Sequence, residues 1–310
     1  MTRVFIDGGA GTTGLEIRER LAGRRDIELI ALPEERRKDA SARRGALNSA
    51  DIVLLCLPDD AAREAVSLIE NDTTRVIDAS TAYRVDPDWT YGFPELEPGG
   101  AARVASSRRV SNPGCYPTGF LALVRPLVRA GLLPADTPLS VNAVSGYSGG
   151  GKSLIARFED PSAPDATDTA FRAYGLALGH KHVPEMQQHA GLTRAPIFLP
   201  AVVHTYRGML VEVPIHLDQV GGRIEPVWEA LSEAYYESAL VSVSSDQPLE
   251  LFVERQAGSD RLELFVYGGD DLGQVRLIAA LDNLGKGAAG AAVQSLNLMA
   301  GLPETEGLRL

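Results

Sequence analysis

The residues best placed to do chemistry surround Cys115, in the segment Ser-Asn-Pro-Gly-Cys-Tyr-Pro-Thr at positions 111–118. Turn-forming residues precede the cysteine and an apolar run follows it, so we predict that Cys115 opens a helix, with Pro117 in the first turn. Unpaired N–H groups and the positive end of the helix dipole favour the thiolate, which is the nucleophilic form. Cys56, the only other cysteine, lies in an apolar strand pattern, and we expect it to be buried and inert.

A glycine-rich segment near the N-terminus is the second candidate site. It follows the predicted strand Val4–Ile6 and precedes a helical pattern that runs to Leu21. Such glycines permit a tight turn and let backbone N–H groups close on a pyrophosphate at the helix N-terminus; the alternative is a plain strand-to-helix turn. The residues expected to hold the cofactor here are Gly8, Gly11, Thr12, Thr13 and Gly14.

The residues after the second predicted strand, 27–32, bear on the type of cofactor. An NAD site often places an acidic residue at the end of this strand, but here the strand ends in Leu-Pro. Arg36, Arg37 and Lys38 come soon after and would suit a 2′-phosphate, which favours NADP(H). The two glutamates at 34 and 35 leave open a second interpretation, that of a solvated charged turn.

Two histidines lie close together in the second half of the chain, at His180 and His182. Because histidine titrates near neutrality, either one could take and return a proton during turnover. A metal site is not favoured, because Glu185 is the only other potential ligand nearby and could instead orient a histidine. A purely structural histidine pair is the remaining alternative.

A loop of four glycines and a lysine, Ser145–Lys152, follows the predicted strand 139–144. Backbone amides in such a loop can bind an anion. Residues 146–153 formally meet the P-loop pattern. For a chain of this size, however, one cofactor site and one site for an anionic substrate are a simpler interpretation than two nucleotide sites. A surface loop without a binding role is the other alternative.

Together these features predict one reaction. The thiolate of Cys115 attacks an activated acyl carbon, and a nicotinamide delivers hydride to the resulting thioester, which releases an aldehyde. A histidine acts as general acid and base, and the Asn112 side chain and the Cys115 N–H stabilise the oxyanion.

The pattern of apolar segments predicts two kinds of architecture. Strands and helices alternate in the first hundred residues, which indicates a doubly wound α/β, Rossmann-like domain. The second half has alternating apolar runs, which indicate an α+β domain with a mixed or antiparallel sheet. The chain closes with a helix of small residues through Met299. The strands predicted in the second half are 139–144, 197–199, 201–203, 208–215, 249–253, 262–266 and 274–281.

The composition and net charge of the chain limit the kinds of binding partner that we expect. The chain has 310 residues, a net charge of −11 and 45% hydrophobic residues, as expected for a globular protein. The negative charge disfavours nucleic acid and anionic membranes as partners. The absence of a long apolar run and of a signal-peptide pattern, with two unlike cysteines, leads us to expect a cytoplasmic protein without disulfides.

Three segments resemble a known family. They are the one around Cys115, Gly-x-x-Gly-Thr-Thr-Gly at 8–14 and Asp-Asn-Leu-Gly-Lys-Gly-Ala at 282–288. Together they are similar to the N-acetyl-gamma-glutamyl-phosphate reductase family in its short form, within the semialdehyde dehydrogenase superfamily. The resemblance covers essentially the whole chain, and the cysteine segment is its most specific part.

The resemblance implies NADPH-dependent reduction of an acyl phosphate, N-acetyl-gamma-glutamyl phosphate, to its semialdehyde in arginine biosynthesis, by a homodimer or homotetramer without a metal. It implies a dinucleotide-binding domain of residues 1–114 with 283–310, and a catalytic and oligomerisation domain of residues 115–282. It makes Cys115 the nucleophile and His180 the acid/base, with His182 second. Further residues implied to bind cofactor or substrate are Ser80 and Asn283 for the cofactor, and Arg84, Ser148, Gly149, Lys152 and Glu185 for the substrate.

Two other functions remain open at this point. A related semialdehyde dehydrogenase acting on aspartyl phosphate or a lysine-pathway acyl phosphate would share all of the chemistry. An NADP-binding redox sensor would use Cys115 as a switch, but such a sensor usually needs a resolving cysteine, and Cys56 is the only candidate.

Overall fold

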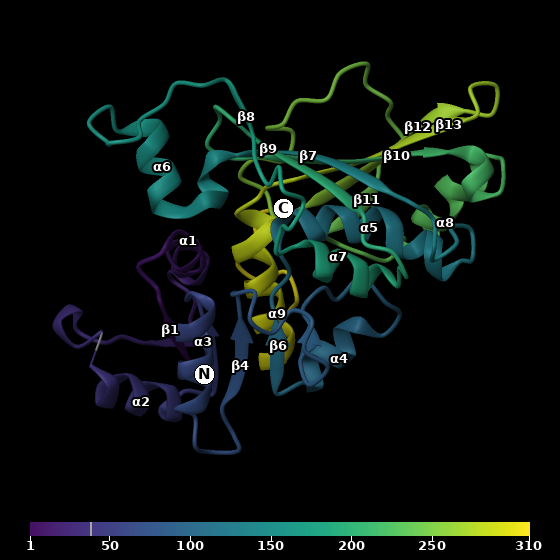
Figure 1. Cartoon of the computed structure of the whole chain (residues 1–310). Helices are drawn as coiled ribbons and strands as arrows, with labels where there is room; N and C mark the ends of the chain where they lie inside the picture. The colour runs from purple at the N-terminus through teal and green to yellow at the C-terminus, as the bar shows by residue number, and fades with distance from the viewer. Residues whose placement is uncertain (38) are drawn as a thin grey trace. The chain divides into compact units, whose positions relative to one another are not determined.

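The computed structural model describes residues 1–37 and 39–310 (Figure 1). This part of the chain divides into two compact units. The first unit contains Met1–Pro113 and Ala288–Leu308, and the second contains Gly114–Gly287 and Arg309–Leu310. Lys38, one of the basic residues discussed above, lies outside the described residues.

A parallel sheet forms the centre of the first unit, and the described residues give it six strands in the order β2-β1-β3-β4-β6-β5. Its carboxyl edge therefore carries the loops that follow β1, β3, β4 and β6, as in doubly wound folds. The strands are β1 (Thr2–Asp7), β2 (Ile27–Ile30), β3 (Ile52–Leu55), β4 (Arg75–Asp78), β5 (Thr90–Tyr91) and β6 (Arg109–Ser111). The helices of this unit are α1 (Thr12–Leu21), α2 (Ala40–Ser49), α3 (Asp59–Ser67), α4 (Gly100–Ser106) and α9 (Gly290–Ala300).

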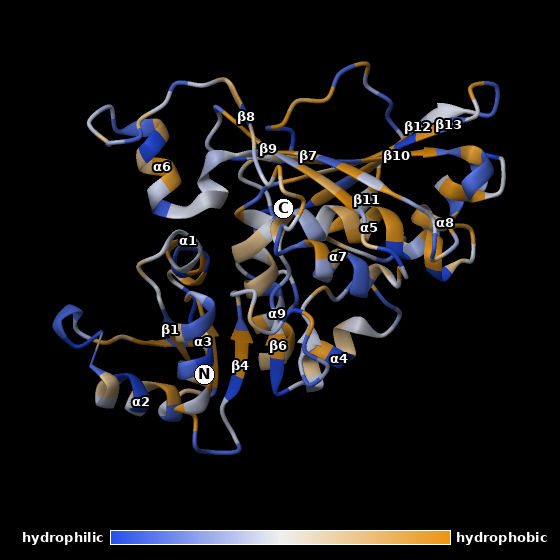
Figure 2. Cartoon of the chain, in the orientation of Figure 1, coloured by the Kyte–Doolittle hydropathy of each residue, from blue (hydrophilic) through white to orange (hydrophobic). Residues whose placement is uncertain are grey.

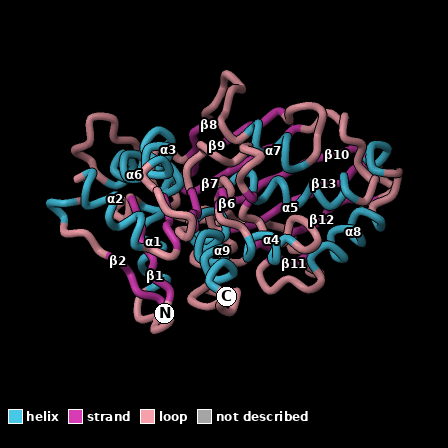
Figure 3. The backbone as a smooth tube through the Cα atoms, turned by 90° about the horizontal axis from the view of Figure 1, so that it is seen from below, coloured by secondary structure: helices cyan, strands magenta, loops and turns pink. Residues whose placement is uncertain are grey.

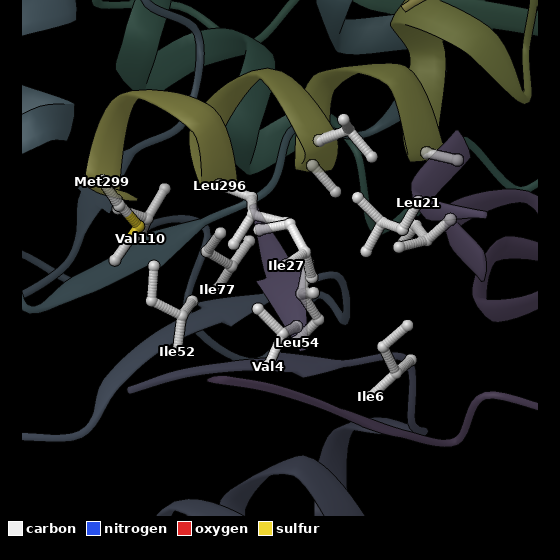
Figure 4. Close-up of a cluster of buried hydrophobic side chains, with 14 of the residues drawn as sticks. Val4, Ile6, Leu21, Ile27, Ile52, Leu54, Ile77, Val110, Leu296 and Met299 are labelled. Atoms are coloured by element: carbon white, nitrogen blue, oxygen red, sulfur yellow. The ribbon is translucent and has the colours of Figure 1, made fainter. Parts of the chain in front are cut away.

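The core of the first unit joins residues from both ends of the chain. Val4 and Ile52 from the central strands are at most 2% exposed and belong to the same cluster as Leu296 and Met299 of α9 (Figure 4). The middle of β4 is orange in Figure 2, and its Val76 and Ile77 are buried, as expected for a parallel strand covered on both faces. The C-terminal helix is thus an integral part of this unit.

A mixed sheet of seven strands, counted over the described residues, forms the second unit in the order β11-β12-β13-β10-β7-β9-β8. Strand β7 is parallel to β9 and antiparallel to β10, so the predicted mixed sheet is confirmed. Its strands are β7 (Ser140–Gly146), β8 (Phe171–Ala173), β9 (Ile197–Val203), β10 (Met209–His216), β11 (Val241–Val243), β12 (Leu262–Gly269) and β13 (Gln274–Leu281).

Helices α5, α7 and α8 lie on one side of this sheet (Figure 1), and the view from below in Figure 3 looks onto that helical layer. The helices of this unit are α5 (Cys115–Arg129), α6 (Gly151–Glu159), α7 (Val183–Ala190) and α8 (Glu225–Tyr235). Helix α5 packs against β10, β12 and β13 and contacts α7 and α8. The helix that begins at Cys115 is therefore the central helix of the unit, held from several sides.

Burial of α5 leads to a stability prediction. Phe120 is fully buried in the middle of this helix, so Phe120→Ala should lower the free energy of unfolding by about 3–5 kcal/mol through lost burial and the cavity left behind. Leu249→Ala is the matched control, because this side chain is fully exposed and should change stability by less than about 0.5 kcal/mol. Chemical denaturation of both variants measures the difference, and equal midpoints would contradict the placement of Phe120.

Most predicted strands are confirmed, but the one at 249–253 is wrong. In the described chain these residues form a loop and the start of a turn. Leu249 and Phe252 point into solvent, while Leu251 packs against the small cluster of Phe265, Ile278 and Ala280. An apolar run predicts a strand only if a neighbouring strand accepts its backbone hydrogen bonds, and a short run does not reveal whether that neighbour exists.

Candidate active site

The glycine loop of the first unit connects β1 to α1 and is tightly packed. Gly8 has φ +80, and a Cβ there would lie 2.2 Å from the carbonyl oxygen of Cys56. A Cβ on Gly14 would lie 2.6 Å from the α-carbon of Gly9. Side chains are therefore excluded at both positions, which leaves the backbone accessible to a close ligand.

The N-terminus of α1 fits the pyrophosphate of a dinucleotide. Gly11 is the N-cap and provides no side-chain cap, so the first N–H groups of the helix remain available for an anion. The Thr12 hydroxyl is buried and, among the described residues, has no hydrogen-bond partner. A buried hydroxyl without a partner beside uncapped N–H groups is the donor set that a phosphate would satisfy.

The basic residues after β2 lie on the surface. Arg36 and Arg37 belong to a 3₁₀ turn that begins at Glu34, and both side chains are largely exposed. Arg36 pairs with Asp39 at 3.5 Å and Arg37 with Glu34 at 3.9 Å. These exposed pairs are weak, so an incoming phosphate could replace their carboxylates.

Polar residues gather where β4 and β6 end in the first unit. The Ser80 hydroxyl donates to the buried carboxylate of Asp78 at 2.6 Å, and the Asn112 N–H donates to the Asp78 carbonyl at 2.7 Å. Burial raises the pKa of Asp78 to about 6. Arg84 donates from Nε to the carbonyl of Asn112 at 3.0 Å and from Nη2 to that of Ala79 at 3.2 Å. Arg84 thus braces the loop that leads to the cysteine.

The Asn112 side chain is also held within the first unit. Its Nδ2 donates to the carbonyl of Ala288 at 3.0 Å, so one amide hydrogen is used there. This bond joins the residue before Pro113 to the segment that precedes α9. The structure therefore gives Asn112 a bracing contact in addition to any contact with a substrate.

Cys115 is the first residue of α5, as predicted. Gly114 is the N-cap with extended φ and ψ angles and no side-chain cap, and the thiol-bearing residue is partly exposed. A helix N-terminus of this kind stabilises a thiolate. Cys56 follows β3, and burial raises the pKa of its thiol to about 12, so it stays protonated at neutral pH. Neither cysteine forms a disulfide.

Glu185 reaches the cysteine loop from α7. Its carboxylate is buried and accepts the N–H of Gly114 at 2.8 Å. A buried carboxylate accepting a backbone N–H makes a charge-assisted bond that fixes both partners. The structure therefore gives Glu185, predicted as a substrate ligand, a second role in holding the N-cap of α5.

The two histidines lie next to each other in the second unit. Their ring centroids are 4.7 Å apart, and the His182 N–H donates to Nδ1 of His180 at 3.1 Å. Neutral His180 therefore carries its proton on Nε2. His182 is buried and its ring lies 5.9 Å from that of Tyr116.

The surroundings of His180 set its protonation. Burial and the charge of Lys181 lower the pKa of His180 below 6.5, while Glu185 opposes this. The imidazole is thus neutral at pH 7 and can act as a base. Lys181→Ala should raise the pKa of His180, because it removes a positive charge that disfavours the imidazolium. If His180 is the base in aldehyde oxidation, the acid limb of the kcat/KM profile then moves to higher pH.

Lys181→Arg is the control for this prediction, because it keeps the charge and should leave the acid limb in place. The measurement is kcat/KM for aldehyde oxidation as a function of pH in the three proteins. An acid limb that stays fixed in Lys181→Ala would contradict the role of His180 as the titrating base.

The predicted anion loop follows β7 and is tied to Asn283. The Asn283 side chain donates from Nδ2 to the Ser148 hydroxyl at 2.8 Å and accepts the N–H of Gly208 at 3.0 Å. Gly149 is exposed, and Lys152 is exposed in the first turn of α6. Asn283 and Ser148 thus shape the loop, while Gly149 and Lys152 are accessible to a ligand.

Tyr174 is a residue that the sequence patterns did not reveal. Its ring contacts the His180 ring edge-on at 5.8 Å, and its hydroxyl is hydrogen bonded to that of Tyr116, the residue after Cys115. Burial raises the pKa of Tyr174 to about 12. Its position six residues before His180 was the only available signal, and it does not distinguish this tyrosine from a core residue.

Residues 1–37 and 39–310 contain neither a membrane-spanning helix nor a cluster of metal ligands. None of the helices described there is long and apolar enough to cross a membrane. No group of three or more histidine, cysteine, aspartate or glutamate side chains in that part of the chain is arranged to hold a metal ion.

A parallel-sheet unit with a dinucleotide loop and a mixed-sheet unit with a thiol at a helix N-terminus define a nicotinamide-dependent oxidoreductase with a cysteine nucleophile. Comparison with known proteins is more specific. Residues 3–103 match the model of the semialdehyde dehydrogenase NAD binding domain, and residues 115–283 match that of the semialdehyde dehydrogenase dimerisation domain. The chain belongs to the semialdehyde dehydrogenase family.

Individual relatives agree with this. The chain is 54% identical to N-acetyl-gamma-glutamyl-phosphate reductase of Brucella ovis and to that of Brucella canis, over 96% of this chain and 99% of each relative. Among solved structures, aspartate semialdehyde dehydrogenase II from Vibrio cholerae has a TM-score of 0.71 at 19% identity, covering 97% of this chain and 99% of that one. The enzyme from Francisella tularensis has a TM-score of 0.71 at 15% identity, covering 96% and 100%. These structures establish the likeness of fold.

Proposed function

We propose that this chain catalyses the reversible NADPH-dependent reduction of N-acetyl-gamma-glutamyl phosphate to N-acetyl-glutamate 5-semialdehyde, with release of phosphate, in arginine biosynthesis. The observation that carries the proposal is the thiol of Cys115 at the N-terminus of α5, in a chain 54% identical to reductases that bear this name. The first unit acts as the cofactor domain and the second as the catalytic and oligomerisation domain.

The reaction follows from the chemistry of the residues. The Cys115 thiolate attacks the acyl carbon, the C–O bond to phosphate breaks, and a thioester forms. NADPH bound at the glycine loop would supply the hydride that reduces this thioester. In this direction His180 first takes up a proton from solvent and acts as the imidazolium. It protonates the oxygen and later accepts that proton back as the carbon–sulfur bond breaks, which releases the aldehyde and restores the thiolate. The N–H of Cys115 and the Asn112 amide stabilise the oxyanion.

The preference for NADP(H) is supported by the charges near the end of β2. No acidic side chain ends this strand, and Arg36 and Arg37 are exposed a few residues later. A 2′-phosphate would pair with these guanidinium groups, whereas the 2′-hydroxyl of NAD would find no carboxylate at the strand end. Ser80 would contact the nicotinamide half of the cofactor, as would Asn283.

Each unit offers groups that match the substrate's charges. Arg84, which is anchored by two backbone carbonyls, offers the rigid cation that a phosphate or carboxylate requires. Gly149 and Lys152 provide exposed amide and ammonium donors in the anion loop, shaped by Ser148. Glu185 lies at the N-cap of the cysteine helix and would limit the position of the acyl group.

We propose further that the protein is a cytoplasmic homodimer or homotetramer that assembles through the second unit. The face of its sheet opposite α5 presents Ile197 and Leu199, which are 53% and 47% exposed. Apolar side chains in a row on an open sheet face favour burial against another sheet. The matched model for this unit is that of a dimerisation domain, which supports the same assignment.

The direct test is the phosphate-dependent reduction of NADP by the purified protein. N-acetyl-glutamate semialdehyde is the substrate, and aspartate semialdehyde is the control. We expect activity with the first compound only. Activity only with aspartate semialdehyde would keep the mechanism but overturn the substrate. Activity with neither compound, despite tight NADPH binding, would contradict the proposed reaction and favour the redox sensor.

A further inference from the structure

Arg18 of α1 is a charged residue that the proposed function has not used. Side chains on a helix lean toward its N-terminus, so Arg18 extends over the positions four and seven residues before it. Those positions are Gly14 and Gly11, which have no side chain to block its path. The glycine spacing that opens the backbone to a ligand therefore also opens a path for this guanidinium.

The guanidinium reaches the glycine loop. A Cβ on Gly9 would lie 2.6 Å from Arg18 Nε and 2.9 Å from its Nη2, so the cation rests against the α-carbon of Gly9. Its Nε is buried and has no hydrogen-bond partner among residues 1–37 and 39–310. The Arg18 side chain as a whole is partly exposed, but a buried N–H without an acceptor is costly, and it indicates a site that an anion completes.

Two carboxylates of β1 and α1 are bound to other arginines. Asp7, at the end of β1, is bound by Arg43 at 2.9 Å, and Glu16 of α1 is bound by Arg20 at 2.7 Å. Arg18 Nε, which rests against the glycine loop, and the buried Thr12 hydroxyl at the start of α1 therefore both lack a hydrogen-bond partner in the described chain.

We propose that Arg18 is a further cofactor-binding residue, which donates from its guanidinium to the pyrophosphate of the nicotinamide dinucleotide. The inference rests on the proposed use of NADP(H). The pyrophosphate is common to NADPH and NADH, so this contact should stabilise both nucleotides by the same factor. Arg36 and Arg37 would instead distinguish the two, because only NADPH carries a 2′-phosphate.

The test is the Kd for NADPH and for NADH, measured by nicotinamide fluorescence titration of the purified protein. Arg18→Met should raise both Kd values in the same ratio, about tenfold or more, as expected for loss of a charge-assisted hydrogen bond. Arg18→Lys keeps the charge but loses the planar donor geometry and should lose less affinity.

Arg25→Met is the matched control, since Arg25 is exposed in the same unit and its replacement removes the same charge. Its Kd values should equal those of the unmodified protein. Arg18→Gln repeats the test if thermal unfolding shows that the methionine variant does not fold. Unchanged Kd values, or a loss for NADPH alone, would overturn the proposal. An unmodified protein that binds neither nucleotide would instead overturn the proposed function.

Discussion

Cys115→Ser should reduce turnover by at least about 10³-fold while NADPH still binds with its original affinity. A serine hydroxyl is not ionised near neutral pH, and the N-terminus of α5 cannot stabilise an alkoxide to the extent that it stabilises a thiolate. The substitution changes one atom at a partly exposed position, so the second unit should keep its fold. The two measurements are the rate of semialdehyde oxidation and the Kd for NADPH.

Cys56→Ser is the control for this experiment. Burial raises the pKa of the Cys56 thiol to about 12, so this residue should contribute no thiolate and its variant should keep near-normal activity. Substantial turnover by Cys115→Ser would contradict the thioester mechanism. Loss of activity in both cysteine variants would point to a pair of cooperating thiols, which the redox-sensor interpretation requires.

His180→Gln should lower kcat by roughly 10²- to 10⁴-fold, the usual contribution of a general acid or base. Its Nδ1 is held by the His182 N–H, which orients the ring and leaves Nε2 as the group that exchanges a proton. Glutamine keeps a similar length and polarity but does not titrate. Steady-state rates in both directions at several pH values test the prediction, because the acid limb of the oxidation profile should disappear with the imidazole.

His182→Gln separates the two histidines. His182 is buried beside Tyr116, and its backbone N–H holds Nδ1 of His180. The His182→Gln variant keeps this N–H, so it should keep more activity than His180→Gln. The thermal unfolding midpoint of each variant shows whether a loss of activity comes from a loss of stability. If His182→Gln lost more activity than His180→Gln at equal thermal stability, His182 rather than His180 would be assigned as the acid/base.

Local patterns predicted much of the first unit and the start of the central helix. The predicted strand Val4–Ile6 lies within β1, and the turn residues before Cys115 correctly located the N-terminus of α5. These features depend on neighbours in the chain, since a turn, a cap and an apolar run all act over a few residues. The glycine-rich turn before α1 was predictable for the same reason.

Contacts between distant segments were not predictable in this way. The bond from Gly114 to Glu185 joins residues 71 apart, and Tyr174 contacts His180 only because β8 and the loop after it run beside β9. The loop at 249–253 shows the converse, an apolar run that no strand pairs with in the described chain. Arg18 Nε has no hydrogen-bond partner in the described chain, and this depends on which carboxylates bind the neighbouring arginines. The spacing of residues in the sequence does not predict such a choice of partners.

The first unit draws its core from both ends of the chain, and this has a consequence for its folding during synthesis. Strands β1, β3 and β4 are translated before the second unit, but Leu296 and Met299 of α9, which pack against them, are translated after residues 114–287. One face of the nascent sheet therefore stays open while the whole second unit is made. Such exposed apolar surfaces favour aggregation, so we expect the unfinished chain to depend on chaperones until α9 has been synthesised.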